Sequence, residues 1–116
     1  LSKTDISRIQ NIKSIDLGDF VERFSHNLQL SQREINIIIR IAEICQEFHL
    51  ISDNTPPSMA AGCIYMYVKH TDKPISKKSI SEVCKISEVT VNKCYKKIDT
   101  NEVILDFLKS VIPSVN

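Results

Sequence analysis

Apolar side chains recur along this chain at the three- and four-residue spacing of amphipathic helices. The first strong example spans residues 19–28, and its apolar positions are Phe20, Val21, Phe24 and Leu28. A longer pattern spans residues 33–49, where isoleucines and other apolar residues cover more than one stripe of a helix. Because such a helix needs neighbours on several sides, we expect this isoleucine-rich helix to lie at the centre of the fold.

Polar residues mark the beginnings of several predicted helices. Ser31 has the spacing of a capping box with Glu34, ahead of the isoleucine-rich helix. Thr55 precedes Pro56, and proline suits the first turn of a helix because the N–H that it lacks would have no partner there. We therefore predict a further helix from residue 56 to about residue 70.

The helix predicted after Pro56 contains a run of small residues around Gly62. Glycine costs a helix about 1 kcal/mol relative to alanine, so its presence indicates that another backbone approaches closely. We expect that neighbour to be the isoleucine-rich helix.

Two shorter helical patterns follow, separated by the three residues 85–87. Ser76 begins the first pattern, whose inward positions are Ile80, Val83 and Cys84. Ser87 begins the second, whose inward positions are Val91, Cys94, Tyr95 and Ile98. A short helix, a tight turn and a second helix form the helix-turn-helix motif, which places its second helix in the major groove of DNA. The motif predicted here spans residues 76–98.

Together these patterns predict an all-α fold of a single domain. The chain has 116 residues, of which 42% are hydrophobic, and this is enough for one core. It contains only two glycines and no run that alternates with period two, which argues against a β-sheet fold. Short helical patterns at residues 4–13 and 101–110 flank the others.

No apolar run approaches the roughly 20 residues that a membrane span requires, so we expect no membrane partner. The chain begins at Leu1 and carries no signal-peptide pattern. We therefore expect it to be a piece of a longer soluble protein.

Potential metal ligands and nucleophiles are scattered along the chain. The cysteines are Cys45, Cys63, Cys84 and Cys94. They lie singly on predicted helices without CxxC spacing, so we predict buried, reduced thiols in a reducing compartment instead of disulfides or a zinc site. His26, His49 and His70 have no partner at catalytic spacing, and the chain has no glycine-rich phosphate loop. We therefore predict no catalytic residue, no metal, no cofactor and no enzyme activity.

The net charge of +1 conceals a basic segment. Residues 69–97 contain eight lysines and three acidic residues, a charge of +5, so the rest of the chain carries −4. Such a surface is either a solvated face or a surface that binds the phosphates of DNA. The candidate phosphate-binding residues are Lys77, Lys78, Lys93, Lys96 and Lys97. Val89, Asn92 and Lys93 lie in the first turns of the second helix, where base edges would be met.

Several stretches of the chain resemble a known family. "TPPSMAAGCIYMY" at residues 55–67 and "ISEVTVNKCYKKI" at residues 86–98 resemble the second cyclin-like repeat of the general transcription factor IIB. "IDLGDFVERFSHNLQLS" at residues 15–31 is similar to the first helix of that repeat, and residues 3–13 are similar to the last helix of the preceding repeat. The resemblance covers nearly the whole chain.

The resemblance implies a five-helix cyclin-like repeat over residues 19–98, with a helix-turn-helix at residues 76–98. Before it would come a tail helix of the preceding repeat at 1–13 and a connector at 14–18, and after it a short helix and tail at 99–116. It also implies a nuclear protein that bridges promoter DNA, TATA-binding protein and RNA polymerase II. The polymerase would be engaged by parts of the protein outside this chain.

In members of that family that read an upstream promoter element, the helix-turn-helix lies in the major groove. By position this role falls on Val89 and Asn92, with Thr90 and Lys93 adjacent. Two residues depart from the family pattern: Asn92 replaces an arginine that reads the element in animal members, and Lys85 replaces a glycine. We therefore expect this surface to bind phosphates and not to select a base sequence.

Two other interpretations stay open. A related RNA polymerase III factor, or an archaeal or viral initiation factor, would share this repeat. A cyclin-box module that binds a protein kinase would share the helices but would show no salt-dependent binding to DNA.

Overall fold

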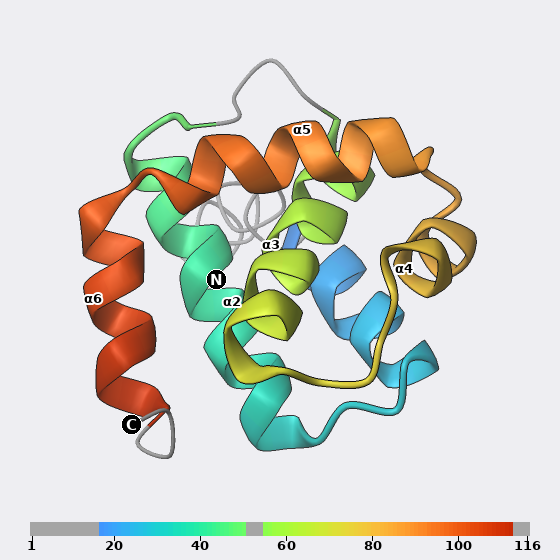
Figure 1. The fold of residues 1–116 in the computed structure, drawn as a ribbon, viewed down its shortest axis with the longest axis horizontal. Coiled ribbons are helices and arrows are strands. Elements are labelled where there is room, and N and C mark those ends of the chain that lie inside the picture. Colours follow the sequence, from blue (N-terminus) through green and yellow to red (C-terminus); the bar gives the residue numbers. More distant parts are fainter. Residues whose placement is uncertain (1–16, 51–54, 113–116) are drawn as a thin grey trace, which may run out of the picture.

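The computed structural model of the chain describes residues 17–50 and 55–112. Every regular element in these two ranges is a helix (Figure 1). The helices are residues 17–27, α2 (Gln32–Glu47), α3 (Pro56–Thr71), α4 (Lys77–Cys84), α5 (Glu88–Asp99) and α6 (Glu102–Val111). The predicted all-α class and the five helices between residues 19 and 98 are therefore confirmed. The helix predicted at residues 4–13 lies outside the described residues.

Side-chain caps explain where several helices begin. Ser31 Oγ accepts a hydrogen bond from the N–H of Glu34 at 3.2 Å, and Glu34 Oε1 accepts one from the N–H of Ser31 at 2.8 Å. The predicted capping box is thus confirmed. Ser76 and Ser87 cap α4 and α5 as predicted, each accepting from the N–H three residues later. Thr55 precedes α3, but its side chain makes no cap hydrogen bond.

Two helix boundaries differ from the prediction. The first described helix begins at residue 17, two residues earlier than predicted. Leu17 is buried in the core, which explains the earlier start. The isoleucine-rich helix α2 ends at Glu47, because His49 has a positive φ of 53° and turns the chain away. Phe48, at the end of that pattern, is 48% exposed.

The centre of the bundle is α3, and the prediction that the isoleucine-rich helix occupies it was wrong. All residues of α3 from Ser58 to Val68 are buried except Tyr65. Helix α2 buries one side and exposes charged residues, among them Arg40 and Glu43, on the other. The small side chains of α3 let neighbours pack on several of its faces, whereas the charged residues of α2 require an exposed side.

Gly62 lies on α3 where another backbone approaches, as expected, but the neighbour is α5 and not α2. A Cβ atom on Gly62 would lie 2.5 Å from Cys94 Cβ and 3.3 Å from the Cys94 carbonyl carbon. Cys63, the next residue, faces the other way and brings its Sγ to 3.9 Å from Cys45 Sγ on α2. The run of small residues therefore packs α3 between the two helices.

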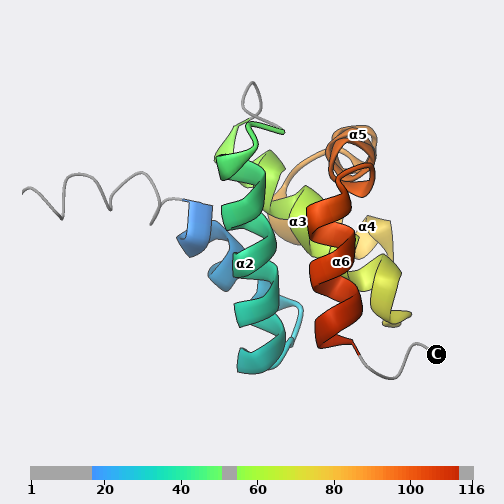
Figure 2. The ribbon, with the colours of Figure 1, turned by 90° about the vertical axis from the view of Figure 1, so that its left-hand side faces the viewer.

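The remaining elements complete a bundle around α3. In Figures 1 and 2, α2 and α6 lie side by side and run in opposite directions, while α5 crosses the end of the molecule above them. Helix α6 lies where a short helix was predicted at residues 101–110; it buries Ile104 and Leu108, and Asn101 caps it. Within the described residues, no helix has the length and apolarity to cross a membrane.

Candidate nucleic-acid interface

Helices α4 and α5 form the helix-turn-helix predicted from the sequence. The turn begins at Lys85, which adopts the left-handed conformation with φ 58° and ψ 42°. This conformation costs a residue with a side chain roughly 1 kcal/mol, and hydrogen bonds around Ser81 hold it. The N–H of Ile86 donates to the carbonyl of Ser81 at 3.1 Å, and Ser81 Oγ donates to the carbonyl of Ile86 at 2.5 Å.

The apolar sides of the helix pair fix its orientation on the rest of the fold. The buried side chains are Ile80, Cys84, Val91, Cys94 and Ile98. Both helices pack on α3, and the contact between Gly62 and Cys94 brings the backbones of α3 and α5 together. The polar side of α5 is therefore directed away from the core.

The predicted interface residues all lie on α4 and α5, where they differ in exposure. Exposed side chains are those of Lys78, Val89, Lys93, Lys96 and Lys97. Lys77, Thr90 and Asn92 are half-buried. Val89 is 65% exposed, which leaves it accessible to a partner.

Three of these positions also have local structural roles. Thr90 gives its N–H to the cap residue Ser87 at 3.2 Å, and its Oγ1 accepts a hydrogen bond from Ser87 Oγ at 3.0 Å. Lys96 and Lys97 lie in the last turn of α5, where positive charge complements the negative end of the helix dipole. Their presence is thus partly explained without any ligand.

A cluster of aromatic rings and lysines next to the helix pair was not predicted. The rings of Tyr65 on α3 and Tyr95 on α5 meet edge to face, with centroids 5.0 Å apart. Lys69 Nζ lies 6.0 Å from the Tyr65 centroid and 5.9 Å from that of Tyr95, and Lys77 Nζ lies 6.0 Å from that of Tyr65. Burial raises the pKa of Tyr95, with smaller contributions from Asp99 and Tyr65, so its hydroxyl stays neutral. The only sequence signal was the spacing of Tyr65 and Lys69, four residues apart on one helix.

The cysteines are buried thiols, as predicted. The thiol contact with Cys45 is the largest cause of a pKa of Cys63 well above its usual value, followed by burial. Burial raises the pKa of Cys84 to about 12. Thiols in this state are poor nucleophiles. Within residues 17–50 and 55–112, no three histidine, cysteine or acidic side chains are grouped so that they could hold a metal ion.

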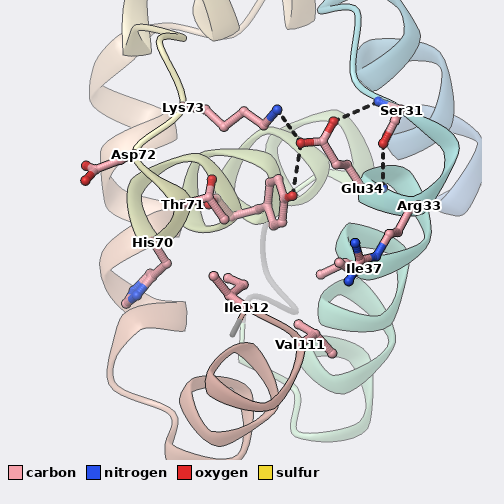
Figure 3. Close-up of a pocket in the computed structure, with 11 residues that line it drawn as sticks. Ser31, Arg33, Glu34, Ile37, His70, Thr71, Asp72, Lys73, Val111 and Ile112 are labelled. Atoms are coloured by element: carbon pink, nitrogen blue, oxygen red, sulfur yellow. Dashed lines mark hydrogen bonds and ion pairs between the residues drawn. The ribbon is translucent and has the colours of Figure 1, made fainter. Parts of the chain in front are cut away.

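A groove of about 770 Å³ lies on another face of the molecule, where α2, the end of α3 and the end of α6 meet (Figure 3). Glu34 forms the polar wall of the groove. The Oε2 atom of Glu34 accepts a hydrogen bond from the Tyr67 hydroxyl at 3.1 Å and forms an ion pair with Lys73. Ile37, Val111 and other residues complete the lining. Sequence reasoning assigned Glu34 to the capping box alone and missed this network.

Burial and hydrogen bonding act in opposite directions on the pKa of Glu34. Burial raises the pKa of its carboxyl, but hydrogen bonds from Lys73, the Ser31 N–H and Tyr67 outweigh burial and lower the pKa below its usual value. Conversely, burial and then the charge of Glu34 raise the pKa of Tyr67 to about 12. At neutral pH the carboxylate is therefore charged and the phenol protonated.

Comparison with known proteins finds a family match that is consistent with the all-helical fold. The family model described as the transcription factor TFIIB repeat matches residues 10–101. A transcription initiation factor IIB-like protein of Acanthamoeba polyphaga mimivirus is 34% identical over 87 residues, which cover 75% of this chain and 19% of that protein.

Two animal proteins named transcription initiation factor IIB are also similar. The one from Xenopus laevis is 31% identical over 88 residues, covering 76% of this chain and 28% of that protein. The one from Homo sapiens is 30% identical over 107 residues, covering 84% of this chain and 34% of that protein. The chain thus spans between about a fifth and a third of the length of these relatives. By the extent of the family match and by these identities, the chain belongs to the family of transcription factor TFIIB repeats.

Proposed function

We propose that this repeat docks a transcription initiation factor on promoter DNA upstream of the TATA element. The whole factor would bridge TATA-binding protein, the DNA and RNA polymerase II. The observation that carries the proposal is the helix pair α4–α5, packed on α3 by its apolar side and exposing a row of lysines on the other. Three relatives named as transcription initiation factors support the setting.

Within this role, the lysines of the helix pair would bind phosphates. Lys78, Lys93 and Lys96 are exposed along the two helices, and this contact requires only positive charge and reach. Lys77 and Lys97 belong to the same row. The negative charge of the rest of the chain would confine DNA to this one basic surface.

Val89 and Asn92 would face base edges, with Thr90 and Lys93 adjacent. Val89 is exposed and could touch a thymine methyl, whereas Asn92 is half-buried and is a weaker base reader than a bidentate arginine. Thr90 is engaged with the cap of α5, which limits it to a supporting role. We therefore propose that docking relies on phosphates, and that TATA-binding protein supplies the position along the DNA.

The remaining assignments follow from the same proposal. Residues 19–98 would form the repeat itself, preceded by a helix of another repeat at 1–13 and a connector at 14–18, and followed by a short helix and tail at 99–116. The polymerase would be engaged by parts outside this chain, and the site of action in a cellular factor would be the nucleus. The repeat would act by binding alone, without catalysis.

The mimivirus relative favours a second candidate, the same docking role in a viral initiation factor. That factor would serve a viral polymerase instead of RNA polymerase II. The helix pair and its lysines would act identically in both settings, so the two candidates differ only in the partner polymerase.

Charge reversal on α5 tests the docking proposal. In a gel shift with TATA-binding protein on a duplex that contains a TATA element, the chain should add a slower band, and Lys93→Glu with Lys96→Glu should abolish it. Each lost phosphate contact should also lower the slope of log affinity against log salt by about 0.9. Lys109→Glu, at an exposed position near the end of α6, is the control, and Lys93→Glu and Lys96→Glu are also tested singly so that the changes of charge match. An unchanged band from the folded double variant would contradict the proposal.

A further inference from the structure

Three helices bring two lysines to one pair of aromatic rings. Tyr65 and Lys69 come from α3, Lys77 is the first residue of α4, and Tyr95 comes from α5. Both ammonium groups lie 6.0 Å from the centroid of the Tyr65 ring, and Lys69 also lies 5.9 Å from that of Tyr95. We call these four residues the tyrosine–lysine cluster.

The rings hold the lysines at defined positions. An ammonium group near the face of an aromatic ring is attracted by about 0.5–1 kcal/mol at an exposed site. The half-buried rings support each other edge to face and offer two such surfaces. The cluster therefore restricts two side chains that are otherwise among the most mobile on a protein surface.

No ion pair in the described part of the chain balances the charges of the cluster. Within residues 17–50 and 55–112, neither Lys69 nor Lys77 forms an ion pair with a carboxylate. Asp99, whose charge contributes to the raised pKa of Tyr95, contacts His70 at 3.2 Å and forms no ion pair with either lysine of the cluster. An anion beside the Tyr65 ring would be attracted by both ammonium groups.

We propose that the tyrosine–lysine cluster binds a phosphate of the DNA backbone beside the helix pair. This inference rests on the proposed function, and it extends the docking surface from α4 and α5 onto α3. Lys77 belongs to the helix pair, so the cluster is continuous with the row of lysines on α4 and α5. Lys69 lies outside the helix pair and would add a phosphate contact that a helix-turn-helix alone does not have.

Duplex DNA fits the cluster better than duplex RNA. The neighbouring helix α5 can enter the wide major groove of B-form DNA while the cluster meets the flanking backbone. The major groove of A-form RNA is too narrow for that arrangement. Phosphate contacts of this kind position the protein and carry no base information.

Salt dependence measures the contribution of each lysine. Affinity of the 116-residue chain for a labelled DNA duplex would be followed by fluorescence anisotropy at several salt concentrations. Lys69→Gln and Lys77→Gln should each reduce the slope of log affinity against log salt by up to about 0.9, and the double variant by up to about 1.8. Lys109→Gln removes the same charge near the end of α6 and should leave the slope unchanged. Thermal unfolding of each variant would verify that it folds.

A pair of tyrosine variants tests whether the rings position the lysines. Tyr65→Phe keeps the ring face and should retain the parent affinity and slope. Tyr65→Leu keeps an apolar side chain but removes the ring face, and should weaken binding several-fold at low salt. Equal binding by the phenylalanine and leucine variants would overturn the role of the rings.

The outcomes separate this inference from the function on which it rests. If Lys93→Gln lowers the slope and Lys69→Gln does not, the helix pair docks on DNA but the cluster does not take part. If no lysine variant changes the slope, the proposed function fails as well. Stronger binding to an RNA duplex of the same sequence would overturn the assignment to DNA.

Discussion

At the scale of single residues, one contact decides how closely the helix pair sits on the core. Gly62 has no side chain, and the Cβ of Cys94 occupies the space where one would be. Glycine lowers the helix propensity of α3, but it also lets the backbones of α3 and α5 approach closely, and this packing offsets the cost. A glycine within a helical pattern predicted this close approach but could not identify α5 as the partner, because the order of helices around α3 depends on the whole fold.

Gly62→Ala should destabilise the fold, although alanine is the better helix former. The new methyl group would lie 2.5 Å from Cys94 Cβ and would push α5 outward, which typically costs about 1–3 kcal/mol. Gly18→Ala is the matched control, because nothing lies within 4 Å of its added Cβ, so it should be neutral or slightly stabilising. The free energy of unfolding in urea checks both. A Gly62 variant as stable as the parent would contradict the tight packing described here.

At the scale of elements, local signals predicted the helices well and their tertiary partners poorly. The seryl caps were visible in the sequence because each depends on neighbours within a few residues. Glu34 shows the limit of that approach. Its capping role was predicted, whereas its contacts with Tyr67 and Lys73 join α2 to the distant end of α3 and have no local signature.

The charge of Glu34 should make the stability of this junction depend on pH. Its folded pKa is lowered, so its contribution is fully present above the unfolded value of about 4.5 and is lost as the pH falls through the folded pKa. Glu34→Gln should cost about 1–2 kcal/mol at pH 7 and less at pH 3, because the stabilising contribution of the carboxylate falls once the pH is below the unfolded value.

Glu43→Gln provides the control for that experiment. Glu43 also pairs with a cation on α2, at 3.1 Å from Arg40, but both side chains are about half exposed and such pairs contribute little. Denaturant unfolding at pH 7 and pH 3 would measure both variants. A Glu34→Gln penalty equal at the two pH values, or no larger than that of Glu43→Gln, would argue against a carboxylate that stabilises the junction.

At the scale of the whole molecule, the fold is a platform for one helix pair. Helix α3 forms the centre, α2 lies on one side of it with α6 beside α2, and α4 and α5 pack elsewhere on α3 (Figure 1). Most lysines of α4 and α5 are exposed. The sequence predicted the helix pair and the outward position of most of its lysines, since both depend on local spacing. The tyrosine–lysine cluster escaped prediction because three separate elements contribute to it.

The most direct test of docking asks where α5 lies on promoter DNA. The four native cysteines are buried, so Val89→Cys, at a position 65% exposed, would present a single reactive thiol for an iron chelate that cleaves nearby DNA. Val103→Cys on α6, at a position 45% exposed, is the matched control. In complexes with TATA-binding protein, the chelate on residue 89 should cleave the DNA at one narrow region upstream of the TATA element, and the chelate on residue 103 should not. Equal cleavage from both positions, or none from residue 89 in a complex that forms, would contradict the docking of this helix pair on DNA.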